Sequence, residues 1–180
     1  MKPILTTYPR SGQHYLIDLI KQQLGYDLEF THDLVISGYD KYISIVRNPY
    51  DCILSWVIME VHCGPLEGSR EFPMKQYMDK AILEYLLYYK YANSKVDILI
   101  DYNDLIDYPN KVIDYISNEL KLIKQNNDYI STIFDRVEGR FLKTSTTSYL
   151  YNEIKAELDT RDLSKCYDLY NQAINKCIDL

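Results

Sequence analysis

Short apolar runs along the chain are separated by longer segments in which apolar residues recur every three to four positions. The short runs predict strands at residues 2–7, 28–31, 41–46 and 96–101. The longer segments predict helices at residues 13–24, 49–61, 74–92, 110–120 and 162–178. Strands that alternate with helices favour a parallel sheet with helices on both faces. We therefore expect one α/β domain over residues 1–180, a three-layer α/β/α fold with a mostly parallel sheet of four to five strands.

Residues typical of helix ends and loops support the predicted boundaries of these helices. Gly25 follows the first helical segment, where a C-terminal cap belongs. Asn48 is a good N-cap for the second helix, with Pro49 at its first position and Asp51 near its positive end. Residues 63–73 hold two glycines and two prolines and predict a loop, the segment we expect to be most mobile. Residues 143–148 form a polar Thr/Ser stretch.

Composition narrows the classes of protein. With 47% hydrophobic residues the chain can bury a core, and it lacks an apolar run of eighteen residues that could span a membrane. The first apolar run is too short for a signal peptide, so we expect a cytoplasmic location. A net charge of −6 argues against a general nucleic-acid binder, because affinity for the phosphate backbone rests on many lysines and arginines. An anion would need a focused local site.

Cysteine, histidine and tyrosine add little by themselves. The four cysteines are scattered and the three histidines do not cluster with them, so we expect reduced structural thiols and no metal site. The 19 tyrosines are attributed to base composition of the gene, and a tyrosine-lined acceptor pocket is left open.

The first candidate site is the turn between the first strand and the first helix, Tyr8-Pro9-Arg10-Ser11-Gly12. A glycine turn that leads into a helix N-terminus presents backbone N–H groups and the positive end of a dipole, which suits phosphate. Arg10 adds a fixed positive charge and Ser11 a hydroxyl. The GxxxxGK[ST] pattern is absent, so ATP or GTP is not the first expectation.

The second candidate site follows the strand at residues 41–46. Arg47 closes that buried strand, where a charge is costly without a partner, and Ser55 lies two turns into the next helix. In one interpretation Arg47 pairs with a carboxylate such as Asp51 and Ser55 faces solvent. In the other, this is a second anion site at a neighbouring strand end. Two such sites on one sheet edge suit a ligand with phosphates at both ends.

Four segments together resemble the sulfotransferases that use 3′-phosphoadenosine-5′-phosphosulfate (PAPS). TTYPRSGQHYL resembles their 5′-phosphosulfate loop, TYPKSGTTW, and SIVRNPYDCILSW resembles their 3′-phosphate motif, RNxxDxxxS. ILIDYNDLIDYPNKVIDYISNELKL is similar to their YEDM-containing strand and helix, and FTHDL is similar to their KTHLP segment. The four segments occur in the family's order over about two-thirds of the chain. The resemblance implies a cytosolic-type, short sulfotransferase domain with a fold like that of the P-loop NTPases.

The resemblance also implies roles for individual residues. His32 matches the general base, and Arg10 the lysine that contacts the 5′-phosphate and the departing bridging oxygen. Arg47 and Ser55 match the 3′-phosphate ligands. Ser11, Gly12, Gln13 and His14 occupy the 5′-phosphate loop, and Tyr15 stands where a tryptophan stacks on adenine. His14 is the rival base, but it lies inside that loop, so we expect it to bind or orient.

The resemblance implies in-line transfer of a sulfuryl group from PAPS to a hydroxyl or amine, leaving 3′-phosphoadenosine-5′-phosphate (PAP). Such a transfer resembles phosphoryl transfer, in which positioning and charge stabilisation dominate. No metal is required. We expect a small-molecule or carbohydrate acceptor and no nucleic acid, and a homodimer is left open.

Two departures from the family pattern bear on activity. Phe30 replaces the lysine that precedes the Thr-His pair. The C-terminal segment that closes on the 3′-phosphate has only Gly139-Arg140-Phe141-Leu142-Lys143 as a stand-in, with Arg140 and Lys143 as its candidate ligands. These departures favour one alternative, a catalytically silent nucleotide-binding domain. A P-loop kinase-like phosphotransferase is the other alternative, and the absent Walker lysine speaks against it.

Overall fold

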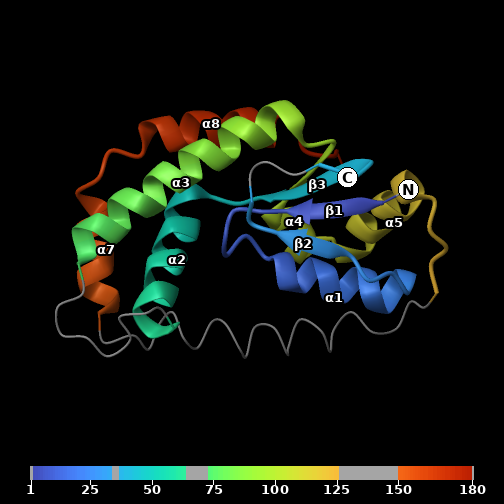
Figure 1. The fold of residues 1–180 in the computed structure, drawn as a ribbon, viewed down its shortest axis with the longest axis horizontal. Coiled ribbons are helices and arrows are strands. Elements are labelled where there is room, and N and C mark those ends of the chain that lie inside the picture. The colour runs from blue at the N-terminus through green and yellow to red at the C-terminus, as the bar shows by residue number, and fades with distance from the viewer. Residues whose placement is uncertain (1, 34–36, 64–72, 126–149, 180) are drawn as a thin grey trace.

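The computed structural model describes residues 2–33, 37–63, 73–125 and 150–179 (Figure 1). Its strands are β1 (Pro3–Thr6), β2 (Glu29–Thr31), β3 (Lys41–Val46) and β4 (Ile98–Asp101). Its helices are α1 (Gln13–Leu24), α2 (Pro49–Cys63), α3 (Met74–Lys95), α4 (Tyr102–Asp107), α5 (Pro109–Leu120), α7 (Tyr151–Asp159) and α8 (Ser164–Ile174). Of the predicted loop over residues 63–73, Cys63 ends α2 and Pro73 precedes α3, while residues 64–72 and the Thr/Ser stretch lie outside the described residues.

The four strands form one parallel sheet in the order β2-β1-β3-β4. Thr6 pairs with Thr31, and Val46 pairs with Asp101, so the strands end at one common edge. The prediction of an α/β fold is confirmed, and the sheet described is entirely parallel with four strands. In parallel sheets of this kind the carboxyl edge is where ligands bind.

Each face of the sheet has its own apolar core, because residues along β3 alternate between the faces. Ile43 and Ile45 pack against α1 and α5, while Val46 packs against α2, α3, α7 and α8. Figure 1 shows the two helical layers that cover the sheet, with α3 and α8 on one side and α1 and α5 on the other. The carboxyl ends of the strands face α2. The three-layer arrangement therefore leaves the loops after the strands at the side of the molecule where α2 begins.

Buried tyrosines of α3 satisfy polar backbone groups at the ends of β1 and β3. Tyr88 donates its hydroxyl hydrogen to the carbonyl of Thr6 and shares a 2.7 Å hydrogen bond with the Ser44 hydroxyl. Tyr89 donates to the carbonyl of Ile45 at 3.2 Å. Buried polar groups need such partners, and a phenol supplies one while its ring fills the core. Much of the tyrosine on α3 thus has a structural role, which composition alone does not reveal.

Most predicted boundaries agree with the structure. The helix at residues 13–24 and the strand at residues 41–46 are confirmed, and Gly25 caps α1 at φ +62° with its N–H bonded to the carbonyl of Lys21. Asn48 caps α2, its Oδ1 accepting the Tyr50 N–H at 3.0 Å. The sequence did not predict α4, which begins directly after β4 with Asp101 as its N-cap. That short helix fixes the first residue after β4, Tyr102, at the sheet edge.

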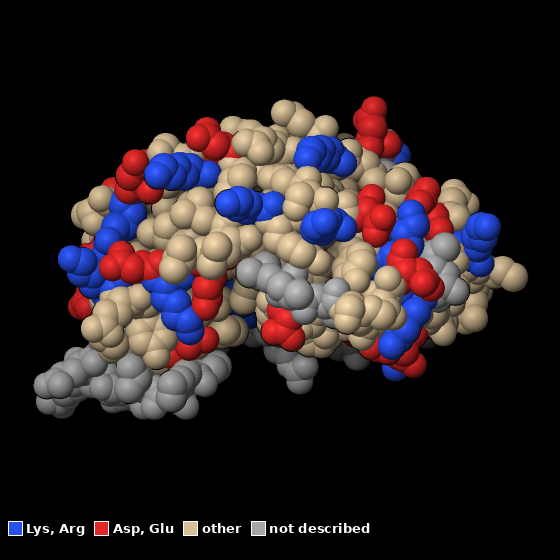
Figure 2. Space-filling model, turned by 45° about the horizontal axis from the view of Figure 1, so that its top comes forward, with Lys and Arg blue, Asp and Glu red and all other residues tan. Residues whose placement is uncertain are grey.

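Surface charges are interspersed on the face drawn in Figure 2, where lysine and arginine side chains alternate with aspartate and glutamate around tan areas. This face offers no continuous basic track of the kind that a nucleic-acid backbone selects. Within the described residues, none of the helices has both the length and the apolar character needed to cross a lipid bilayer.

Candidate functional site

Residues that directly follow the four strands meet at the carboxyl edge of the sheet. The turn containing Arg10 follows β1, His32 follows β2, Arg47 follows β3 and Tyr102 follows β4. The sequence predicted three of these positions from strand ends. Parallel pairing brings them to one edge, as that prediction required.

The turn between β1 and α1 has two residues in the left-handed region, Arg10 at φ +69° and Gly12 at φ +95°. Such a conformation is unfavourable for an arginine and concentrates at functional sites. Gly12, the N-cap residue of α1, has no side chain to cap the helix, and the first N–H groups of a helix lack an intrahelical acceptor. The turn therefore combines the backbone shape and the helix terminus that favour an anion.

Both the backbone and the guanidinium of Arg47 make contacts with neighbouring residues. Its Nη1 donates to the backbone carbonyl of Arg10 at 2.7 Å, and its guanidinium carbon lies 4.3 Å from the centre of the Tyr102 ring. The hydroxyls of Tyr89 and Tyr85 bond to its backbone N–H and carbonyl at 3.1 and 2.9 Å. Its Nε is buried and has no hydrogen-bond partner in the described part of the chain. Within the described residues, that donor is therefore left without an acceptor.

The alternative in which Arg47 pairs with a carboxylate is not what the structure shows. Among the described residues, no Asp or Glu lies within ion-pair distance of Arg47, Asp51 included. A partly buried guanidinium is costly without a compensating charge. A bound anion would remove that cost.

Arg10 and Ser55 are in direct contact, since Arg10 Nε donates to Ser55 Oγ at 2.9 Å. The sequence placed these two residues in separate anion sites. The structure joins the two sites through this bond and through the bond from Arg47 to the Arg10 carbonyl. Arg10 and Arg47 therefore lie together at one edge of the sheet.

His32 is held in one tautomer. Its Nδ1 lies 2.8 Å from the backbone carbonyl of Thr7, which can only accept a hydrogen bond. Nδ1 therefore carries the proton, and in the neutral ring Nε2 keeps its lone pair. This is the form that a general base requires.

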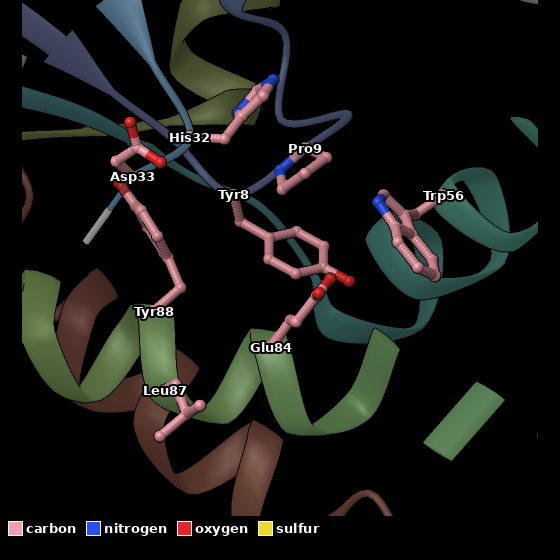
Figure 3. Close-up of a pocket in the computed structure, with 8 residues that line it drawn as sticks. All are labelled: Tyr8, Pro9, His32, Asp33, Trp56, Glu84, Leu87 and Tyr88. Atoms are coloured by element: carbon pink, nitrogen blue, oxygen red, sulfur yellow. The ribbon is translucent and has the colours of Figure 1, made fainter. Parts of the chain in front are cut away.

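A pocket of about 600 Å³ opens beside His32 at the carboxyl edge of the sheet. Its lining comes from the β1–α1 turn, the end of β2, α2 and α3: Tyr8, Pro9, His32, Asp33, Trp56, Glu84, Leu87 and Tyr88 (Figure 3). Pro9 and Trp56 are the chain neighbours of Arg10 and Ser55. His32 thus lines the pocket, whereas Arg10, Arg47 and Ser55 are not among its described lining residues. A volume of this size suits a small organic molecule.

The remaining residues of the predicted phosphate loop differ in what they offer. Ser11 is buried, and its hydroxyl donates to the carbonyl of Tyr8 at 2.8 Å, so it stabilises the turn from within. Gln13 is buried with its Oε1 unpartnered in the described structure. Tyr15, on α1, is only 3% exposed and belongs to the core that α1 shares with the sheet and α5, so stacking on a base would require its ring to be uncovered. Burial raises the pKa of Tyr15 to about 12.

His14 lies close to Phe30, with ring centres 5.5 Å apart, and Phe30 in turn lies 5.9 Å from His32. Partial loss of water lowers the pKa of His14 below its ordinary value, although Asp18 opposes the shift. His14 is therefore held toward its neutral form beside the phosphate loop. Phe30 is 44% exposed and contacts both histidine rings.

Several residues of the site were not predicted, and two predicted ones cannot be placed. Tyr102, which supports Arg47, was missed, although its position as the first residue after β4 could have identified it. The pocket wall on α3, formed by Glu84, Leu87 and Tyr88, carried no sequence motif, whereas Trp56 on α2 ends the SIVRNPYDCILSW segment. Arg140 and Lys143 lie outside the described residues.

We predict that Gly12→Ala destabilises the fold and disturbs the site. A Cβ at Gly12 would lie 2.9 Å from Cε2 of Tyr102, and the backbone there has φ +95°. Strain and the displaced ring together should lower the free energy of unfolding by about 2–3 kcal/mol. Urea denaturation measures this loss.

Gly38→Ala is the matched control, because Gly38 has φ +90° but no atom within 4 Å of its added Cβ. It should lose only the cost of backbone strain, about 1 kcal/mol. Equal losses in the two variants would show that Tyr102 does not pack against Gly12 as described.

Comparison with models of known protein families and with curated protein sequences finds no match. What the chain does must therefore follow from the chemistry of its own site. The described structure establishes an α/β fold whose four parallel strands end at a cationic edge beside a pocket.

Proposed function

We propose that this protein is a sulfotransferase that transfers the sulfuryl group of PAPS to a hydroxyl or amine. The observation that carries the proposal is the junction of two strand-end motifs, made by Arg47 Nη1 on the Arg10 carbonyl and Arg10 Nε on Ser55 Oγ. A nucleotide with phosphates on both its 3′ and 5′ carbons needs two cationic groups at one edge. The fold supplies them from β1 and β3.

The residues present fit such a nucleotide. The unpartnered Nε of Arg47 would donate to an oxygen of the 3′-phosphate, with Ser55 beside it. The 5′-phosphate would lie at the α1 terminus, where uncapped N–H groups and the Arg10 guanidinium provide donors. Forked guanidinium donors match phosphate geometry better than an ammonium group does.

PAPS supplies an activated sulfuryl group, and the chain's residues supply base, charge and position. His32 would take the acceptor's proton on Nε2 while Nδ1 stays bonded to the Thr7 carbonyl. Arg10 and the α1 terminus would offset the negative charge that develops on the departing nucleotide. The pocket lined by His32 and α3 would hold the acceptor next to this base.

The test is transfer of labelled sulfuryl groups from PAPS to a mixed pool of alcohols, phenols and amines. We expect labelled products with PAPS and far fewer with adenosine 5′-phosphosulfate, which lacks the 3′-phosphate. Transfer of labelled phosphoryl from ATP instead would favour a kinase-like phosphotransferase. Tight PAP binding with no transfer to any acceptor would favour a catalytically silent nucleotide-binding domain, for which Phe30 in the lysine position is the main support.

A further inference from the structure

Among the residues that the structure describes, the lining of the pocket beside His32 carries acidic but no basic side chains apart from the histidine. Two of the eight described lining residues, Asp33 and Glu84, are carboxylates, and none of these eight is lysine or arginine. We propose that the molecule bound in this pocket carries a positive charge, as an amine attached to a small aromatic or aliphatic body. Calling that molecule the acceptor rests on the proposed function, whereas the charge preference rests on the pocket alone.

The α2–α3 wall already accommodates a cation. The ammonium of Lys80 lies 3.7 Å from Glu84 Oε1 and 5.3 Å from the centre of the Trp56 ring. A carboxylate and an indole face are the two groups that attract ammonium ions most strongly in proteins. Lys80 itself is outside the lining and its side chain is 56% exposed, so its ion pair with Glu84 is weak and a bound amine can replace it.

The rest of the lining limits the size and shape of the body of the ligand. Tyr8 and Tyr88 are buried, and their hydroxyls are engaged with the carbonyls of Ala81 and Thr6, so they offer mainly ring surface. Leu87 adds an apolar side chain from α3, and Figure 3 shows Glu84 reaching from α3 toward Tyr8. A small aromatic amine fits this combination of rings, one aliphatic side chain and a carboxylate.

The same charges disfavour anions. A carboxylate or sulfate on the ligand would face Glu84 and Asp33, and like charges at close range penalise the wrong partner. Asp33 is held in place by Thr31, whose hydroxyl donates to its carboxylate at 3.0 Å. Asp33 and Glu84 therefore both favour a cationic ligand over an anionic one.

Trp56 makes the proposal directly measurable, because it is the single tryptophan of the chain and lines the pocket. Selective excitation of its indole reports binding without any donor nucleotide. The probes are tyramine, 4-methylphenol and 4-hydroxyphenylacetate, which share a phenol and differ in charge. We expect tyramine to bind about three- to tenfold more tightly than 4-methylphenol, as for a partly exposed ion pair, and 4-hydroxyphenylacetate to bind most weakly.

Two variants on one turn of α3 should act in opposite directions. Glu84→Gln should remove the preference for tyramine over 4-methylphenol, and Lys80→Gln should increase it, because Glu84 then has no competing cation. Equal binding of all three probes, or a tyramine preference that survives Glu84→Gln, would overturn the proposal. Calorimetry with PAP on the same samples separates the two ideas. Selective amine binding without PAP binding would support the pocket inference and reject the sulfotransferase, and PAP binding without amine selectivity would do the reverse.

Discussion

His32→Ala should reduce sulfuryl transfer by about 10²- to 10⁴-fold, the usual contribution of a positioned general base. The bond from Nδ1 to the Thr7 carbonyl sets the tautomer, so Nε2 is the nitrogen that can take the acceptor's proton. The loss should appear in kcat with saturating PAPS. Affinity for PAP should change little, because His32 is not among the residues proposed to hold the nucleotide.

His14→Gln is the matched control for His32→Ala. His14 lies on α1 and shares Phe30 as a neighbour with His32, but it is not part of the pocket lining. Because His14 belongs to the proposed 5′-phosphate loop, His14→Gln should weaken PAPS binding. Its kcat with saturating PAPS should stay within a few-fold of the parent, in contrast to the loss for His32→Ala. If His14→Gln loses transfer and His32→Ala keeps it, the base has been assigned to the wrong histidine.

Arg47→Ala should weaken PAP binding by about 1.5–3 kcal/mol, the usual worth of hydrogen bonds to a charged group. The guanidinium has a buried Nε that no described residue bonds, and removing it removes the proposed donor for the 3′-phosphate. Binding of ADP should fall much less, because ADP has no 3′-phosphate. Calorimetric titration of both nucleotides measures the difference.

Arg47 also holds the β1–α1 turn through the Arg10 carbonyl, so a second variant is needed to separate the two roles. Arg47→Lys keeps a positive charge but loses the forked donors and the contact of the guanidinium with the Tyr102 ring. We expect it to retain part of the preference for PAP over ADP. Equal losses of PAP and adenosine 5′-phosphosulfate binding in Arg47→Ala would contradict the assignment of Arg47 to the 3′-phosphate.

The elements of this fold were predictable where local signals agree. In α1, helical periodicity over residues 13–24 coincides with a glycine at the C-terminal cap, and the helix has those bounds. In β3, β-branched residues form a short run closed by Arg47 and Asn48, and both ends were correct. Helix α4 was missed, because six residues between a strand and a Tyr-Pro pair carry too little periodicity to be distinguished from a turn.

The candidate site was predictable only in part, because contacts between elements are not written in local patterns. That Arg10 and Arg47 would lie at one edge followed from parallel pairing. The bond between Arg10 and Ser55 depends on how α2 leaves β3, and the support that Tyr102 gives Arg47 depends on the position of β4 in the sheet.

The pocket could not be predicted from the sequence for the same reason. Glu84 and Leu87 belong to a long helix whose sequence predicts only that it is amphipathic. Which of its turns faces His32 depends on how α3 crosses the sheet, and the hydroxyls of Tyr85, Tyr88 and Tyr89 fix that crossing through bonds to strand-end backbone. Their role explains why tyrosine counts could not separate a pocket from a core.

The most direct measurement is calorimetric titration of the unmodified protein with PAP, ADP and ATP under identical conditions. The central claim is that strand-end arginines from β1 and β3 grip two phosphates of one adenosine. It predicts that PAP binds at least about tenfold more tightly than ADP, a difference of about 1.4 kcal/mol for one charged contact. Affinity for ATP or ADP equal to or above that for PAP would contradict it.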